Sequence, residues 1–304
     1  MAELKLDTEH LLQTGNLELL AKQVIEGFIT GLHKSPYHGF SVEFAEHRLY
    51  NTGESTRHID WKLYARTEKL FTKRYEEETN LRCYMAIDCS SSMFFPQEGL
   101  SKISFSVYAA ASLMQLLSKQ RDASGLCLFD EQINYLSEAR ATGLHRRLMF
   151  GRMEQLLKAP QQNKGSNIAK VLHELSESIH KRSMVMVFTD MLDSTVDLDE
   201  LFSALQHLRF NKHEVILFHV SDKKLEAEFD FSNSPYVFVD METGERMKLQ
   251  PQALKKQYLE AWDSFKKELV TRCMQYKIDF VEAEVGTDFA QVLLPFIMKR
   301  AKLY

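Results

Sequence analysis

The sequence predicts an α/β protein with a doubly wound, mostly parallel sheet, and two observations support this prediction. From Leu81 onward, short apolar runs alternate with longer amphipathic segments, which is the pattern of parallel strands joined by crossover helices. Several apolar runs also end in polar residues, as expected where parallel strands deliver their carboxyl ends into ligand-binding loops. At 304 residues with 44% apolar side chains, the chain is long enough for one large domain, alone or with a smaller appendage.

The expected strands are short apolar runs bounded by turn residues. They span residues 83–87, 125–129, 132–136, 183–188, 214–220 and 278–285, with 132–136 as an edge strand. The expected helices have apolar residues at helical spacing and span residues 100–119, 144–158, 167–181, 197–208, 251–276 and 287–302. Residues 235–249 are expected to form a hairpin that turns through Glu242, Thr243 and Gly244.

The chain before residue 81 has a different character. Residues 8–33 carry Leu, Val, Ile and Phe at helical spacing. Residues 34–80 are rich in charged and aromatic side chains and contain turn signals, so short strands with irregular connections are expected there. We therefore expect two parts. Residues 1–80 would form an N-terminal helix and an arginine-rich segment that pack on the main domain. Residues 81–304 would form the α/β domain with its hairpin insertion.

The composition argues against several classes of protein. A net charge of −4 and an isoelectric point near 6.3 argue against a general nucleic-acid-binding protein. No apolar run approaches the roughly 18 residues that a membrane span needs, and the N-terminal residues lack the apolar core of a signal peptide. The four cysteines and eleven histidines have no zinc-binding spacing. We therefore expect a cytoplasmic protein with no membrane span, no nucleic-acid partner and no zinc site.

The most informative motif is Asp88-Cys-Ser90-Ser-Ser92, which directly follows the first expected strand of the sheet. One carboxylate and two hydroxyls at alternate positions of a loop can converge on a small, hard cation such as Mg²⁺, which prefers oxygen ligands. A site with few charged ligands leaves such an ion able to accept a carboxylate from another molecule. The motif is short, and the structural alternative is a polar turn in which Asp and Ser bond backbone groups.

Two further polar clusters fall at the same edge of the predicted sheet. Ser166 stands at the start of an amphipathic helix and could supply a third hydroxyl, or serve only as the helix N-cap. Asp190 follows the strand over residues 183–188 and could supply a second carboxylate, or serve only in a turn. Polar clusters at three junctions together favour a metal site over three unrelated turns.

The segment before the sheet contains a longer signature, whose parts are Arg48-x-Tyr50, Gly53-Glu54, Arg57-x-Ile59-Asp60-Trp61 and Ala65-Arg66. With Asp88-Cys-Ser90-Ser-Ser92-Met93, this signature resembles the von Willebrand factor A-like bacterial family known as domain of unknown function 58. Members of that family often sit beside MoxR-type AAA+ ATPases. The resemblance covers most of the chain, and it implies a Rossmann-type fold of the von Willebrand factor A kind.

The resemblance also implies a metal-ion-dependent adhesion site whose ligands are Asp88, Ser90, Ser92, Ser166 in the third loop and Asp190 as the last carboxylate. Two positions depart from the family pattern. Ser166 stands where von Willebrand A domains usually have Thr, which keeps the hydroxyl but loses a methyl group. Glu54 stands where Asp is usual after Gly53, and this bears only on the signature segment. Asn167 is a lesser candidate for the third ligand.

These observations favour a non-enzymatic binding module over an enzyme. Mg²⁺ or Mn²⁺ held by Ser90, Ser92 and Ser166, and through water by Asp88 and Asp190, would take an Asp or Glu from a partner protein. The resemblance implies that the partner is a MoxR-type ATPase, a client protein or both, with a role in complex assembly or maturation. The alternative is a Mg²⁺-dependent, haloacid-dehalogenase-like phosphohydrolase with Asp88 as nucleophile, although such enzymes carry a second Asp where Ser90 stands.

Partner contacts are expected in two places. Met93 and Phe94 follow the metal-binding motif and could line the rim of a partner interface, where Met and aromatic side chains are enriched, or simply pack in the core. Arg48, Arg57 and Arg66 could bind carboxylates or phosphates of a partner, or form an internal ion-pair network.

Overall fold

The computed structural model describes residues 16–32, 47–49, 61–73, 81–158, 165–191, 198–287 and 294. The chain divides into two compact units, one comprising residues 1–31 and 81–304 and the other residues 32–80. Helix α2 (Leu17–Leu32) contributes buried side chains to the core of the larger unit. The predicted helix over 287–302 lies outside the described residues except for positions 287 and 294.

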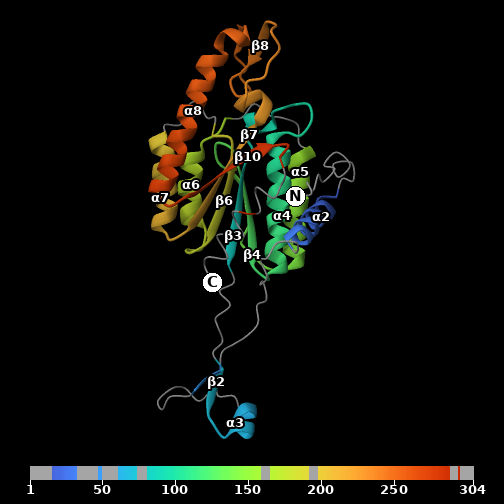
Figure 1. Ribbon diagram of the computed structural model, residues 1–304, viewed down its shortest axis with the longest axis vertical. Helices are drawn as coiled ribbons and strands as arrows, with labels where there is room; N and C mark the ends of the chain where they lie inside the picture. The colour runs from blue at the N-terminus through green and yellow to red at the C-terminus, as the bar shows by residue number, and fades with distance from the viewer. Residues whose placement is uncertain are drawn as a thin grey trace. The chain divides into compact units, whose positions relative to one another are not determined.

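A six-stranded sheet forms the centre of the larger unit (Figure 1). Its strands are β3 (Arg82–Asp88), β4 (Ala123–Phe129), β5 (Ile133–Leu136), β6 (Met184–Thr189), β7 (Glu214–Asp222) and β10 (Asp279–Val285). Their order is β10-β7-β6-β3-β4-β5, and every neighbouring pair is parallel except the β4–β5 pair at the edge. The prediction of an α/β fold with a mostly parallel sheet is confirmed.

Helices cover both faces of the sheet, with α2, α4 and α5 on one face and α6, α7 and α8 on the other (Figure 1). Besides α2, these helices are α4 (Lys102–Lys119), α5 (Gly143–Lys158), α6 (Ile168–Ser178), α7 (Leu198–Phe210) and α8 (Pro251–Gln275). Alternate side chains of β3 enter the two cores, with Met85 and Ile87 on the α4 side and Tyr84 and Ala86 on the α6 side. A strand buried on both faces reads as a continuous apolar run, which explains the pattern in the sequence.

The predicted hairpin is present as β8 (Tyr236–Val239) and β9 (Arg246–Leu249), after a short π-helical turn, η3 (Lys223–Ala227). Stacked aromatic rings hold it against α8, because Phe229 lies 4.3 Å from Tyr258 and 6.2 Å from Phe238, measured between ring centroids. An isolated two-stranded hairpin is only marginally stable, so this aromatic cluster is what fixes the hairpin on the domain.

The smaller unit contains β1 (His47–Leu49) paired antiparallel with β2 (Phe71–Lys73), and helix α3 (Trp61–Thr67). Trp61 and Tyr64, on α3, are 61% and 41% exposed. The prediction that this segment packs on the main domain stays a prediction. Across the described part of the chain, no helix combines the length and apolar character that crossing a bilayer requires.

Candidate metal site at the carboxyl edge of the sheet

The predicted site falls at the point where the order of the strands reverses. After β3 the chain adds β4 on one side of it, and β6 later pairs with the other side. Asp88 and Thr189 are the last residues of the neighbouring strands β3 and β6. In open parallel sheets, ligands bind in the crevice at this kind of switch point, outside the carboxyl ends of the strands.

Asp88 is buried, with 1% of its surface exposed, and its carboxylate accepts hydrogen bonds from several of the described residues. The backbone N–H of Ser90 donates to Oδ1 at 2.9 Å. The hydroxyls of Thr189 and Ser166 donate to Oδ2 at 2.8 Å and 3.3 Å. The fold therefore brings three segments of the chain to one carboxylate, and the candidate ligand Ser166 is in one of them.

The two motif serines complete this cluster. The hydroxyl oxygens of Ser90 and Ser92 lie 3.2 Å apart and form a hydrogen bond, in the turn that begins the short helix η2 (Ser91–Phe94). Ser90 is fully buried, whereas Ser92 is partly exposed. The hydroxyls of Ser90, Ser92, Ser166 and Thr189 thus lie in one hydrogen-bonded cluster with Asp88. Thr189 was not predicted, although its position at the end of an apolar strand was visible.

Ser166 and Asn167 have different roles. The Asn167 side chain accepts a hydrogen bond of 3.1 Å from the backbone N–H of Lys170 and is the N-cap of α6. The Ser166 hydroxyl points instead to Asp88. The helix cap and the candidate ligand are therefore adjacent residues, and the N-cap alternative for Ser166 does not apply.

Asp190 lies beside this cluster but is bound by a lysine. The Lys102 ammonium is 2.8 Å from Asp190 Oδ2 and 2.6 Å from Glu226 Oε1, and 1% of the Lys102 side chain is exposed. Sequence reasoning missed both Lys102 and Glu226. The available signal for Lys102 was a charged residue at the start of a largely apolar helix, close behind the motif. Glu226 had no comparable signal.

Burial determines the electrostatics of the site. Desolvation, followed by the charge of Asp190, raises the pKa of Asp88 from 3.8 to about 6, against the opposing effect of its hydrogen bonds. Desolvation lowers the pKa of Lys102, but the neighbouring carboxylates of Asp190 and Glu226 outweigh it and the net shift is upward. Desolvation also raises the pKa of Glu226, against the attraction of Lys102. Burial therefore makes the charged forms of both Asp88 and Glu226 costly.

The donor set fits a small divalent cation. Every donor in the cluster is oxygen, which suits Mg²⁺ or Mn²⁺ rather than a soft metal. Among the residues that the structure describes, no Lys, Arg or His donates to the Asp88 carboxylate, and no group of three or more His, Cys, Asp and Glu forms a metal site by itself. With all groups ionised, three carboxylates (Asp88, Asp190, Glu226) and one ammonium (Lys102) leave two net negative charges, which one divalent ion would balance.

The expected partner contacts require a correction. Met93 has no exposed surface and belongs to the main hydrophobic core, so it cannot line the rim of an interface. Phe94 is partly exposed and packs against the same core. Arg66 is exposed on α3, and Arg48 lies in β1. Arg57 is outside the described residues.

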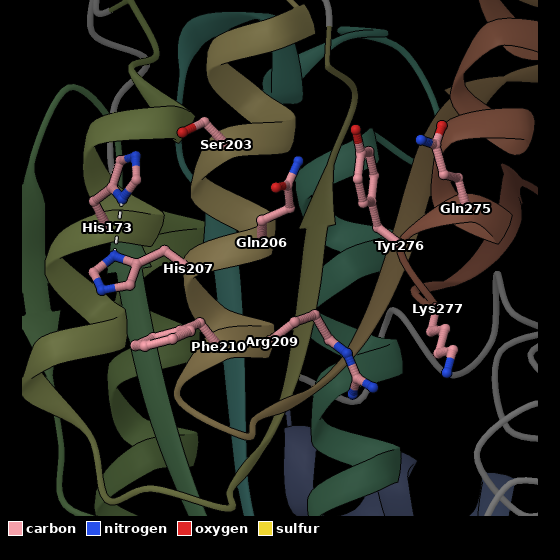
Figure 2. A pocket seen from close by; sticks show the side chains of 9 residues that line it. All are labelled: His173, Ser203, Gln206, His207, Arg209, Phe210, Gln275, Tyr276 and Lys277. Carbon is pink, nitrogen blue, oxygen red and sulfur yellow. Dashed lines mark hydrogen bonds between the residues drawn. The ribbon is translucent and has the colours of Figure 1, made fainter.

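A separate pocket of about 640 Å³ opens among helices α6, α7 and α8, on the face of the sheet shown in Figure 2. Its side chains include two histidines whose Nδ1 atoms are 2.9 Å apart, His173 and His207. Glu177 lies 2.7 Å from Nε2 of His207. None of the residues of the Asp88 cluster lines this pocket, so the two features are separate sites.

Comparison with known proteins identifies a family. The family model described as "Protein of unknown function DUF58" matches residues 46–268. Uncharacterized proteins of Mycobacterium tuberculosis and Mycobacterium bovis are 27% identical over 176 residues, which is 58% of this chain and 55% of each relative. The chain thus matches only about half the length of these curated relatives.

Two solved structures align with most of this chain. A conserved hypothetical protein, BatB, from Bacteroides thetaiotaomicron aligns with a TM-score of 0.46 at 14% identity, covering 73% of this chain and 99% of that one. An aerotolerance-related membrane protein from Bacteroides fragilis aligns with a TM-score of 0.43 at 12% identity, covering 72% of this chain and 99% of that one. The family assignment rests on the family model, not on these alignments.

Proposed function

The chain belongs to the family of proteins of unknown function DUF58, and we propose that it is a non-enzymatic protein-binding module of the von Willebrand factor A type. Its binding depends on a divalent cation at the carboxyl edge of the sheet. The observation that carries this proposal is Asp88, a fully buried carboxylate at the switch point of the sheet that is surrounded by hydroxyl groups and has no cationic partner among the described residues.

Each residue of the cluster has a distinct part in this proposal. Ser90, Ser92 and Ser166 offer hydroxyl oxygens as direct ligands, while Asp88 and Asp190 hold bound water and supply negative charge. Thr189 and the backbone N–H of Ser90 orient Asp88. When bound, Mg²⁺ or Mn²⁺ supplies a positive centre that accepts an Asp or Glu carboxylate from a partner as its final ligand. Few of the proposed ligands are charged, which keeps that position attractive to an incoming carboxylate.

The partner in this proposal is a MoxR-type AAA+ ATPase or a client protein that the two handle together in complex assembly. The family resemblance of the signature segment and of the Asp88 motif supports this choice. The sequence has no Gly-x-x-x-x-Gly-Lys-Ser/Thr loop of its own. The energy for any remodelling would therefore come from the partner.

The test is the melting temperature of the protein in EDTA, in Mg²⁺ and in Mn²⁺. A ligand that binds only the folded state stabilises it by about 2.7 kcal/mol at a concentration of 100 times its Kd. We expect the wild type to show a concentration-dependent rise, and Asp88→Ala and Ser90→Ala to lose it. Ser178→Ala is the matched control, because that serine bonds only its own helix backbone on an exposed surface.

A second experiment tests partner binding. Pull-down of a MoxR-type ATPase, or of an acidic client, should weaken in EDTA and in Ser90→Ala. A complex of full strength in EDTA would rule out the metal-dependent mechanism. The phosphohydrolase alternative predicts Mg²⁺-dependent turnover of an aryl phosphate, lost in Asp88→Asn. Asp88 is 1% exposed and its two oxygens accept hydrogen bonds from the chain, so no observation favours it as a nucleophile.

A further inference from the structure

Lys102 is a buried cation beside the proposed metal site. It is the first residue of α4, and its backbone N–H donates to Phe95 O at 2.9 Å in the loop that follows the motif. Its side chain is directed inward, where 1% of it is exposed and the ammonium lies 5.8 Å from the centre of the Phe95 ring. A buried ammonium is costly unless it is paired and hydrogen-bonded, so the position of this group requires its two carboxylate partners.

The two partners of Lys102 differ in what else holds them. Glu226 lies in η3, and its second oxygen accepts a hydrogen bond of 2.7 Å from the backbone N–H of Asp222. This bond anchors Glu226 independently of the lysine. Asp190 instead directly follows β6, next to Thr189, which bonds Asp88, and its backbone carbonyl lies 3.1 Å from Nε2 of His219. Lys102 therefore bridges one carboxylate that belongs to the proposed metal site and one that does not.

We propose that Lys102 is an internal competitor for the divalent cation, because its ammonium holds Asp190 and so lowers the affinity of the isolated site for Mg²⁺ or Mn²⁺. This inference rests on the proposed function and describes how the metal affinity of the same site is regulated. Two positive centres that share one buried carboxylate repel each other, and this repulsion is strong where water is excluded. Glu226 gives the ammonium a partner to keep when Asp190 turns toward a metal-bound water.

This arrangement accounts for the two carboxylates on one lysine. If Asp190 were the sole carboxylate partner of Lys102, capture of Asp190 by the metal site would leave the buried ammonium unpaired, which is strongly unfavourable. With Glu226 anchored nearby, Lys102 can transfer its bonds to Glu226 without leaving the interior. The site is thereby held at low affinity in the free protein. An added negative charge, such as a partner's carboxylate at the metal, favours the metal-bound arrangement.

The test compares Kd values for Mn²⁺ alone, measured by titration calorimetry on the full chain. The double variant Lys102→Met/Glu226→Gln removes one positive and one negative charge, so the site keeps its net charge of −2 while Asp190 loses its lysine. We expect it to bind Mn²⁺ about tenfold or more tightly than the wild type. The single variant Glu226→Gln leaves Asp190 as the charged partner of the Lys102 ammonium in this pair, so it should weaken Mn²⁺ binding about tenfold. Chemical unfolding in EDTA measures the stability of each variant separately.

The outcomes separate this inference from the proposed function. If the wild type binds Mn²⁺ but the double variant binds no tighter, or Glu226→Gln binds no weaker, the competitor role is wrong while the metal site stands. If only the double variant binds, Lys102 blocks the site in the isolated protein and the inference holds. If no form binds Mn²⁺, both proposals fail. A purely structural role for the lysine predicts weaker binding in both variants.

Discussion

The Thr189 hydroxyl donates a hydrogen bond of 2.8 Å to the Asp88 carboxylate and so joins the ends of two adjacent parallel strands. The same oxygen accepts a hydrogen bond of 3.1 Å from the backbone N–H of Met191. Met191 has a left-handed backbone conformation, with φ of 53°, which is unfavourable for a residue with a side chain. One hydroxyl therefore orients Asp88 and also stabilises the turn that carries Asp190.

Replacing Thr189 by Val should destabilise the metal-free protein. Val has nearly the same shape but leaves the Met191 N–H and one Asp88 oxygen with fewer partners, which costs about 1–3 kcal/mol. The measurement is the free energy of unfolding in urea with EDTA. Thr189→Ser keeps the hydroxyl and is the control. Equal stability of Thr189→Val and Thr189→Ser would show that the hydroxyl is not needed to hold the turn.

The raised pKa of Asp88 predicts a dependence of stability on pH. Its pKa rises from 3.8 to about 6 on folding, so between these values the folded protein keeps a proton that the unfolded chain has lost. Stability of the metal-free protein should therefore fall as the pH rises from about 4 to 6, and remain lower above that range.

Asp88→Asn tests that dependence, because an amide cannot ionise. Above about pH 6 and in EDTA, the variant should be more stable than the wild type, and its stability should lack the fall between about pH 4 and 6. The variant should also lose stabilisation by Mg²⁺ or Mn²⁺. Asp230→Asn, which changes an exposed carboxylate, is the control. A variant less stable than the wild type across this range would contradict the assigned cost of burying the Asp88 charge.

Substitutions of Ser166 and Asn167 test which of these adjacent residues is the metal ligand and which is the cap of helix α6. Ser166→Ala should weaken the metal-induced rise in melting temperature, because it removes the hydroxyl nearest to Asp88 from the third loop. Asn167→Ala should cost about 1 kcal/mol of stability through loss of the α6 cap, with the metal response retained. The reverse assignment of effects would mean that Asn167 is the ligand.

The corrected position of Met93 leads to a stability prediction. Met93 is fully buried beside α4, so Met93→Ala should lower the free energy of unfolding by about 2–5 kcal/mol. Met93→Leu keeps the volume and should cost less than about 1.5 kcal/mol. Denaturant titration in EDTA measures both variants. If Met93→Ala were neutral, the side chain would not be part of a packed core.

Much of the fold and part of the site could be predicted because their signals are local. Apolar periodicity placed the strands of the sheet within a few residues, and the Asp88 motif marked the end of the central strand. Thr189 was missed because a hydroxyl at a strand end has no distinctive pattern until its neighbour is known. Met93 was misplaced as a partner contact because a sequence position beside a loop does not reveal which way the side chain packs.

The sequence by itself determined the alternation of strands and helices and the polar residues at the ends of β3 and β6, since periodicity and turn chemistry depend on neighbours in the chain. Only the tertiary structure decided that Ser166 turns to Asp88 while Asn167 caps the helix. It also decided that Lys102 pairs with Asp190, 88 residues away, and with Glu226, 124 residues away. The physical reason is that a buried charge takes whichever partners the packing of distant elements brings within reach, and no local pattern encodes that choice.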